Sequence, residues 1–257
     1  MAIHPTALVD PAARVGPGCE IGPYAVVGPA VTLGEGCSVG AHAVVTGRTT
    51  LGKRNRVFPH AVVGEIPQDL KYRGEDSRLE IGDRNTFREF TTVNLGTEGG
   101  GGVTRIGSGG LFMAYSHVGH DCDIGDGAIV ANGVALAGHI LIEDHVHISG
   151  LAAAHQFTRI GRLAFVSGLT GVAMDVAPYC TVAGARAELA GLNVVGLQRA
   201  GMTEEQVARV KQLYKVFFRS GLPAAEALAQ IKAELGAHPE VAHFVAFVEA
   251  SKRGITR

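Results

Sequence analysis

Six histidines lie close together in the chain, and no other residue type offers as wide a range of chemistry here. Imidazole titrates near neutrality, with a pKa of about 6.5, so a neutral histidine can take a proton from a hydroxyl group. The same ring is a common zinc ligand. The six are His117, His120, His139, His145, His147 and His155. What each of them does depends on the elements that position it.

An apolar residue recurs every six positions along much of the chain. The first run extends from Val9 to Val63, the frame reappears at Ile81, and another run extends from Ile106 to Val172. A period of six fits neither an amphipathic helix nor a long alternating strand. It indicates short strands joined by tight turns, which is typical of a parallel β-helix.

This repeat resembles that of the hexapeptide-repeat proteins, whose left-handed parallel β-helix has three hexapeptides in each triangular coil. Residues 18 apart then lie in one column, in coils about 4.8 Å apart. Cys19 and Cys37 share such a column, so a disulfide between them is conceivable. Both hold the small inward position otherwise taken by alanine, and we expect them to pack there as small apolar groups.

The 18-residue period groups the chemically active residues. His120, Gly138 and Gln156 form one column, and Asp121 and His139 form the next. His120 could act as a general base, with a carboxylate to fix its tautomer and the Gly138 amide to stabilise an oxyanion. This set suits acyl transfer from a thioester to a hydroxyl or amine. No serine or cysteine is placed as an obvious nucleophile, which favours direct transfer.

A zinc site is the competing interpretation of the histidines. Zinc needs three ligands that converge on one point. His117 lies near His120 in the sequence and His139 lies in the adjacent column, so a third ligand is available. The Gly138 and Gln156 column is better explained by acyl transfer, and we expect no metal.

Two polar excursions and a change of period divide the chain. We expect loops near 64–80 and 94–105, of which the first, with its charged residues, is favoured for a binding role. A capping box at Thr203–Gln206 opens a helix, and two more are expected over 223–235 and about 239–252. The predicted fold is mainly β: a β-helix over 1–185 and a small helical domain over 186–257.

Charge and composition limit the class of protein. The net charge is −1, which gives no support for nucleic-acid binding. Residues 199–257 hold nine Lys or Arg and six Glu, so the helical end could attract an acidic partner. The N-terminus shows no signal peptide, the apolar runs are short, and the four cysteines have no metal or redox spacing. We expect a cytoplasmic protein that does not insert stably into membranes.

At the histidines the resemblance narrows to one family. The segments NLGTEGG, LFMAYSHVGHDCDIG, LAGH and HQF resemble those of the bacterial UDP-N-acetylglucosamine O-acyltransferases, the first acyltransferases of lipid A biosynthesis. QDLKYRGE in the first loop and GLNVVGLQR before the helices match as well. The resemblance covers nearly the whole chain. It implies a homotrimer with active sites between neighbouring β-helices, an acyl-carrier-protein donor carrying a 3-hydroxyacyl chain, and no cofactor.

The resemblance also implies roles for individual residues. His120 is the expected base for the glucosamine 3-hydroxyl, with Asp121 assisting it and the Gly138 amide binding the oxyanion. A glycine at Gly168 matches the position that limits acyl length and leaves room for a long chain. Further substrate contacts are expected from two groups, the loop residues and the nucleotide-sugar residues. They are Gln68, Asp69 and Lys71, and His117, His139, His155, Gln156, Asn193 and Arg199.

One departure leaves the acceptor open. Some members of the family have histidine where this chain has Asn94, and Leu95 replaces a basic residue. The acceptor could therefore be an amino sugar, which would give an amide product.

The chain could also be the later N-acyltransferase of lipid A assembly, a zinc enzyme, or a scaffold without activity. The later N-acyltransferase has an extra N-terminal domain, whereas the repeat here begins by Val9.

Overall fold

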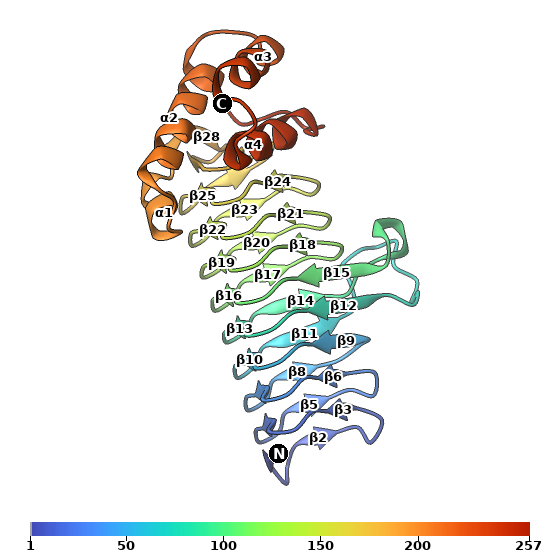
Figure 1. The fold of residues 1–257 in the computed structure, drawn as a ribbon. Helices are drawn as coiled ribbons and strands as arrows, with labels where there is room; N and C mark the ends of the chain where they lie inside the picture. Colours follow the sequence, from blue (N-terminus) through green and yellow to red (C-terminus); the bar gives the residue numbers. More distant parts are fainter. Residues whose placement is uncertain (1) are drawn as a thin grey trace.

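The computed structural model describes residues 2–257 as a tall stack of triangular coils with helices at its C-terminal end (Figure 1). Each coil contributes one short strand to each of three sheets, which we call A, B and C. Sheet A contains β1 (Ala2–Ile3), β4 (Glu20–Ile21), β7 (Ser38–Val39), β10 (Arg56–Val57), β13 (Thr86–Phe87), β16 (Leu111–Phe112), β19 (Ile129–Val130), β22 (His147–Ile148), β25 (Phe165–Val166), β27 (Cys180–Ala183) and β28 (Glu188–Leu192).

The other two sheets complete the triangle. Sheet B contains β2 (Leu8–Val9), β5 (Val26–Val27), β8 (Val44–Val45), β11 (Val62–Glu65), β14 (Thr92–Asn94), β17 (His117–Val118), β20 (Ala135–Leu136), β23 (Ala153–Ala154) and β26 (Gly171–Val172). Sheet C contains β3 (Arg14–Val15), β6 (Thr32–Leu33), β9 (Thr49–Leu51), β12 (Arg78–Ile81), β15 (Val103–Ile106), β18 (Asp123–Ile124), β21 (Leu141–Ile142) and β24 (Arg159–Ile160). The chain turns from A to B, from B to C and from C to A at three corners, which we name by these letters.

The strand register confirms the 18-residue coil. Val27 pairs with Val45, and His117 pairs with Ala135, both in parallel. Across the first loop the offset grows, because Val63 pairs with Val93. The inserted residues therefore lie outside the coil. Beyond both loops, residues 18 apart pair again.

One continuous core fills the inside of the stack. The residues that recur every six positions point inward and are almost all buried, as are the small residues between them. Phe87 and Phe112 stack inside the core with ring centroids 5.0 Å apart. Cys19 and Cys37 are buried free thiols, each donating to a backbone carbonyl, so the packing interpretation is confirmed.

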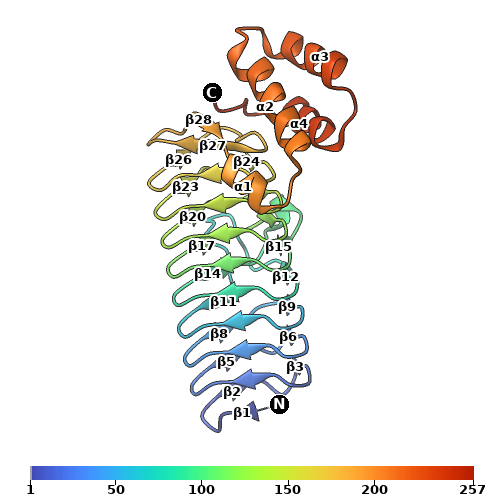
Figure 2. The ribbon, with the colours of Figure 1, turned by 60° about the vertical axis from the view of Figure 1, so that its left-hand side comes forward.

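Both excursions leave the stack at the B–C corner. The first connects β11 to β12, and the second connects β14 to β15 through the 3₁₀ turn Glu98–Gly100. They contact each other, since the Leu95 N–H donates to the Glu65 carbonyl at 3.0 Å. Two loops thus project together from one side of an otherwise regular solenoid in Figure 1, and they lie behind the stack in the view of Figure 2.

The C-terminal part contains α1 (Val194–Arg199), α2 (Glu204–Arg219), α3 (Ala224–Leu235) and α4 (Pro239–Glu249). The capping box at α2 is present, with Thr203 and Gln206 each bonding the other's backbone N–H. Helices α2 and α3 begin and end near the predicted residues, whereas α4 ends three residues before Lys252. The short helix α1 and the hairpin β27–β28 were not predicted, because neither shows a clear period.

A second apolar core attaches the helices to the last coils. Leu163, Ala177 and Tyr179 of the coils pack with Leu197 and with the buried faces of α2, α3 and α4. The fully buried Asp175 accepts hydrogen bonds from the Arg159 N–H and the Ser251 hydroxyl, and so ties the C-terminal tail to the stack. We propose that the chain divides into units 1–185 and 186–257. No helix within residues 2–257 is long and apolar enough to cross a membrane.

Candidate active site

The B–C corner brings the predicted catalytic residues together. His120 follows β17, and Gly138 and Gln156 follow the equivalent strands of the next two coils. Asp121, His139 and Phe157 come next in each coil, and all three have positive φ angles of 57°, 61° and 64°. The left-handed backbone at this repeated position is what aims their side chains outward along the corner.

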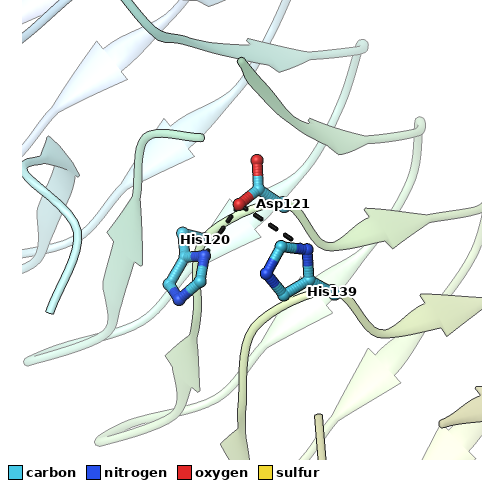
Figure 3. A group of neighbouring side chains, drawn as sticks. All are labelled: His120, Asp121 and His139. Atoms are coloured by element: carbon cyan, nitrogen blue, oxygen red, sulfur yellow. Dashed lines mark hydrogen bonds and ion pairs between the residues drawn. The ribbon is translucent and has the colours of Figure 1, made fainter. Parts of the chain in front are cut away.

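His120 and Asp121 form a hydrogen-bonded pair (Figure 3). The imidazole Nδ1 lies 2.7 Å from Asp121 Oδ2, and the carboxylate side chain is 1% exposed. Since an ionised carboxylate only accepts hydrogen bonds, Nδ1 must carry the proton. The lone pair on Nε2 is then free to act as a base.

Gly138 lies directly against the His120 ring. A Cβ atom at Gly138 would lie 2.5 Å from Cε1 and 2.6 Å from Nε2, so only glycine leaves room for the imidazole. Within residues 2–257, the Gly138 N–H has no hydrogen-bond partner. The corner therefore offers a base nitrogen and an unpaired backbone donor on neighbouring coils, which is the arrangement that thioester chemistry needs.

His139 lies beside this pair and not across from it. Its ring stands at 89° to that of His120 and stacks on Phe157, with centroids 4.9 Å and 4.5 Å away. Its Nδ1 is 3.8 Å from Asp121 Oδ2, beyond hydrogen-bond distance. Burial lowers the pKa of His139, only partly opposed by Asp121. A neutral ring held by stacking is suited to contact a substrate.

The remaining predicted corner residues lie around the pair. His117 points outward from sheet B and bonds the Thr92 hydroxyl through Nδ1 at 2.7 Å, and burial lowers its pKa, helped by the charge of His120. His155 and Gln156 are exposed, with the His155 Nδ1 3.0 Å from the Gln156 carbonyl oxygen. They form the next rung of the same surface.

The first loop reaches this corner as well. Gln68 and Lys71 are exposed and Asp69 is half-buried, with its Oδ1 accepting from the Lys71 N–H at 2.9 Å. The charges of Asp69 and Lys71 act with opposite signs on the pKa of His139. Asp69 and Lys71 of the first loop are thus close enough to His139 in a single chain to influence it.

Three predicted residues lie elsewhere in the chain. Asn193 is the N-cap of α1 and accepts from the Gly196 N–H, while its amide donates to the Leu163 carbonyl. Asn193 and Arg199 line a cavity of about 860 Å³ over sheet A, beside His145 and His147. Gly168 lies at the A–B corner, where an added Cβ would approach the Gly150 carbonyl at 3.3 Å.

A cluster with the spacing of a metal site is present, but its third member is Asp121 and not His117. Nitrogen atoms of His120 and His139 and an oxygen of Asp121 lie within 4.8 Å of one another. However, His120 Nδ1 and Asp121 Oδ2 are bonded to each other at 2.7 Å, and Thr97 also donates to this oxygen. A metal ion would have to displace those contacts, so the donor set fits a proton relay better than a metal.

Sequence reasoning did not identify several residues of this corner. Thr97 and Thr104 both bond Asp121, through its side chain and its backbone N–H respectively. Phe157 supports His139 by stacking on its ring. His147, one of the six histidines, does not belong to this corner: it lies on sheet A, where burial and the charge of Arg199 lower its pKa. Phe157 was detectable, because it lies 18 residues after His139. The threonine contacts cross the irregular second loop and follow no period.

The family models that match the chain cover both of its parts. Residues 12–47 match the bacterial transferase hexapeptide of six repeats. Residues 175–256 match domain 2 of the UDP N-acetylglucosamine O-acyltransferases.

Relatives of known name match over the full length. An acyl-[acyl-carrier-protein]–UDP-N-acetylglucosamine O-acyltransferase of Anaeromyxobacter dehalogenans is 77% identical over 257 residues, covering 100% of both chains. The enzyme of that name from Myxococcus xanthus is 56% identical, covering 99% of both chains.

Solved structures agree with the fold. A UDP-N-acetylglucosamine acyltransferase from Bacteroides fragilis has a TM-score of 0.96 at 38% identity, covering 99% of this chain and 100% of its own. The Acinetobacter baumannii structure has a TM-score of 0.96 at 40% identity, covering 100% of both chains. These matches confirm the predicted left-handed parallel β-helix with a small helical part.

Proposed function

This chain belongs to the family of acyl-[acyl-carrier-protein]–UDP-N-acetylglucosamine O-acyltransferases, and from that premise we propose that His120 is the general base of the reaction. The reaction is the transfer of an acyl chain from acyl carrier protein to UDP-N-acetylglucosamine, in lipid A biosynthesis. We take the chain to be a 3-hydroxyacyl group and the acceptor to be the 3-hydroxyl. One observation carries the catalytic proposal: the His120–Asp121 pair lies against Gly138, whose backbone N–H has no partner within residues 2–257.

The geometry supports one sequence of proton transfers. His120 Nε2 takes the proton from the acceptor hydroxyl as the oxygen attacks the thioester carbonyl. The Gly138 N–H donates to the oxyanion of the tetrahedral intermediate. When the carbon–sulfur bond breaks, the imidazolium returns its proton to the leaving thiolate. The Asp121 carboxylate stabilises the imidazolium without taking its proton. The His120–Asp121 pair is therefore regenerated at the end of each turnover.

Asn94 bears on the choice of acceptor. Its side chain is 3% exposed, and its amide donates to the Ile66 carbonyl at 3.0 Å, so it braces the first loop. A residue bound to loop backbone is a weak basis for a changed acceptor. The ester product is therefore favoured over the amide.

A product assay tests the function. The purified protein is given 3-hydroxyacyl carrier proteins of several chain lengths, with either UDP-N-acetylglucosamine or its 3-amino analogue, and products are identified by mass. We expect the ester from the hydroxy acceptor. Amide as the main product would overturn the acceptor assignment, and absence of both products would overturn the function.

We propose that the enzyme is a homotrimer, because one chain separates residues that should share a substrate. The sheet A face lies opposite the B–C corner of a triangular coil, so Asn193 and Arg199 lie far around the stack from His120. A neighbouring chain that presents its sheet A face to this corner would bring the two groups together. Such a head-to-tail contact closes into a ring, which the family resemblance gives as three chains.

The outward residues of the sheets indicate that sheet B, besides sheet A, contacts a neighbouring chain, whereas sheet C faces water. The outward residues of sheet C include Arg14, Glu80, Arg105, Asp123 and Arg159, as expected for a solvated face. Those of sheet B include one charged residue within the described strands, Glu65 at the end of β11, and are otherwise mainly valine, alanine and leucine. Burying that face against another chain would remove apolar area from water.

The A–B corner adds an aromatic ladder between the two faces. Tyr24, His42, His60, Phe90 and Tyr115 stack with centroids 4.9 to 5.2 Å apart. Tyr115 is 66% exposed, and Leu151 and Leu169 extend the same corner at 65% and 70%. An exposed, largely aromatic and aliphatic edge of this length marks an interaction site, and we propose that it lies near the trimer axis.

Replacing Tyr115 with glutamate should separate the chains. A carboxylate in the ladder would be buried without a partner on assembly, which strongly disfavours association. We expect light scattering after gel filtration to report monomers, with unchanged circular dichroism and loss of most activity. Arg14→Glu on the exposed face of sheet C is the matched control and should remain a trimer. A trimeric Tyr115→Glu protein would contradict this interface.

Two further proposals, on the binding of the carrier protein and on the cellular compartment, are supported by the composition of the chain. We propose that the basic residues of the helical unit attract the acidic acyl carrier protein, since residues 199–257 hold nine Lys or Arg and six Glu. We also propose a cytoplasmic location. The four buried free cysteines support a reducing compartment.

A further inference from the structure

The Asp121 carboxylate is held by more than the histidine that it serves. Its Oδ1 accepts from the Thr97 N–H at 2.8 Å. Its Oδ2 accepts from the Thr97 hydroxyl at 2.6 Å and from His120 Nδ1 at 2.7 Å. Thr97 therefore bonds both oxygens at once and fixes the plane of the carboxylate, which in turn fixes the direction in which Oδ2 meets the imidazole.

The second loop is shaped to bring this residue onto Asp121. A Cβ atom at Gly100 would lie 1.9 Å from Asp121 Cγ, so the turn can close over the carboxylate only because residue 100 is glycine. The Thr97 carbonyl accepts from the N–H groups of Gly100 and Gly102, at 3.0 and 2.7 Å. Thr97 is 6% exposed, so the contact is sheltered from water. We call Thr97 and Gly100 the Asp121 clamp.

The clamp is anchored at both ends to the rest of the chain. The Gly96 N–H donates to the Arg78 carbonyl at 3.2 Å, and the Glu98 N–H donates to Glu75 Oε1 at 3.3 Å. Glu75 belongs to the first loop, which carries the proposed substrate residues. The clamp therefore connects the substrate loop to the catalytic pair.

The charges around Asp121 make a neutral donor important. Within residues 2–257, its partners in ion-pair range are the imidazoles of His120 and His139. Asp69 and Lys71 act with opposite signs on the pKa of His139, and burial and His120 lower the pKa of His117. No Lys or Arg of the described residues bonds Asp121. Thr97 thus stabilises the carboxylate without adding a positive charge that would oppose the imidazolium.

We propose that Thr97 is a positioning residue for catalysis. It holds Asp121 so that Asp121 Oδ2 fixes the orientation of the His120 ring and attracts the protonated ring less strongly than a free carboxylate would. This inference rests on the function proposed above for the His120–Asp121 pair. A hydrogen bond to a carboxylate lowers its attraction for a nearby cation. Removing the Thr97 hydroxyl should therefore let the His120 ring turn out of its catalytic orientation. It should also stabilise the protonated form of the His120 ring, because Asp121 would attract it more strongly.

Thr97→Val tests this, because it keeps the shape and the backbone N–H while it removes the hydroxyl. We expect kcat to fall about tenfold, since hydrogen bonds to charged groups carry effects of that size. KM should change less than about twofold, because the buried Thr97 hydroxyl bonds Asp121 and is not free to contact a substrate. The acid limb of the kcat/KM profile should move to higher pH, and Thr97→Ser should restore both the rate and the profile.

Matched variants separate positioning from folding. Thr49→Val removes another buried hydroxyl, on β9 of sheet C, that bonds the Thr46 carbonyl, and it should leave kcat unchanged. Gly100→Ala should lower kcat as Thr97→Val does, whereas Gly99→Ala, whose Cβ meets open space, should not. This pair provides a second test if Thr97→Val folds poorly.

Two outcomes would overturn the role of Thr97: a Thr97→Val enzyme with the rate and pH profile of Thr49→Val, or a Gly100→Ala enzyme as active as Gly99→Ala. If His120→Ala abolishes activity, either of these results would contradict the role of Thr97 and leave the proposed function of the pair intact. If His120→Ala keeps full activity, the function proposed for the His120–Asp121 pair is itself contradicted.

Discussion

His120→Ala should lower kcat about a thousandfold, because general base catalysis contributes factors of about 10² to 10⁴. Among the described residues, the change removes the only ring that both bonds Asp121 and lies against Gly138. KM for either substrate should change little, since His120 acts on the proton and not on the groups that hold the sugar. Initial rates with saturating donor and acceptor measure the effect.

The fold should survive this substitution. His120 lies at a corner, outside the inward core, and its side chain is 15% exposed. Thermal unfolding and the elution volume should therefore match those of the native enzyme. His4→Ala, at an exposed histidine of the first coil, is the matched control and should keep its activity. A His120→Ala enzyme within tenfold of the native rate would refute the assignment of the base.

Gly138→Ala should lower kcat about a hundredfold by displacing the base. The added Cβ would lie 2.6 Å from His120 Nε2, which no ordinary contact allows, so the ring must move. A misplacement of about 1 Å in a reacting group costs about this much in rate. The methyl group also narrows access to the Gly138 N–H, the proposed oxyanion donor.

The matched control adds the same methyl group where there is space for it. Gly99→Ala lies in the second loop, with nothing near its Cβ, and should be as active as the native enzyme. A Gly138→Ala enzyme with native kcat would show that the imidazole need not lie against residue 138. It would therefore weaken the assignment of both the base and the oxyanion donor.

The period of the sequence determined the stacking of the catalytic residues. In a solenoid each coil contacts only its neighbours, so a fixed spacing in sequence becomes a fixed contact in space. That is why His120 could be placed against Gly138, and His139 beside Asp121, from the repeat alone. The same rule predicted the buried packing of Cys19. The capping box likewise located the start of α2, because its signal is local.

The tertiary structure decided what the period does not cover. Thr97 reaches Asp121 through a loop of irregular length, and the direction of that loop depends on contacts with Arg78 and Glu75.

By itself, the sequence determined the coil, its columns and the candidate base, because those follow from a repeat and its local residues. Only the tertiary structure decided how the loops close on Asp121 and that Asn193 lies over the opposite sheet. These depend on packing between distant segments, which no spacing within one repeat specifies.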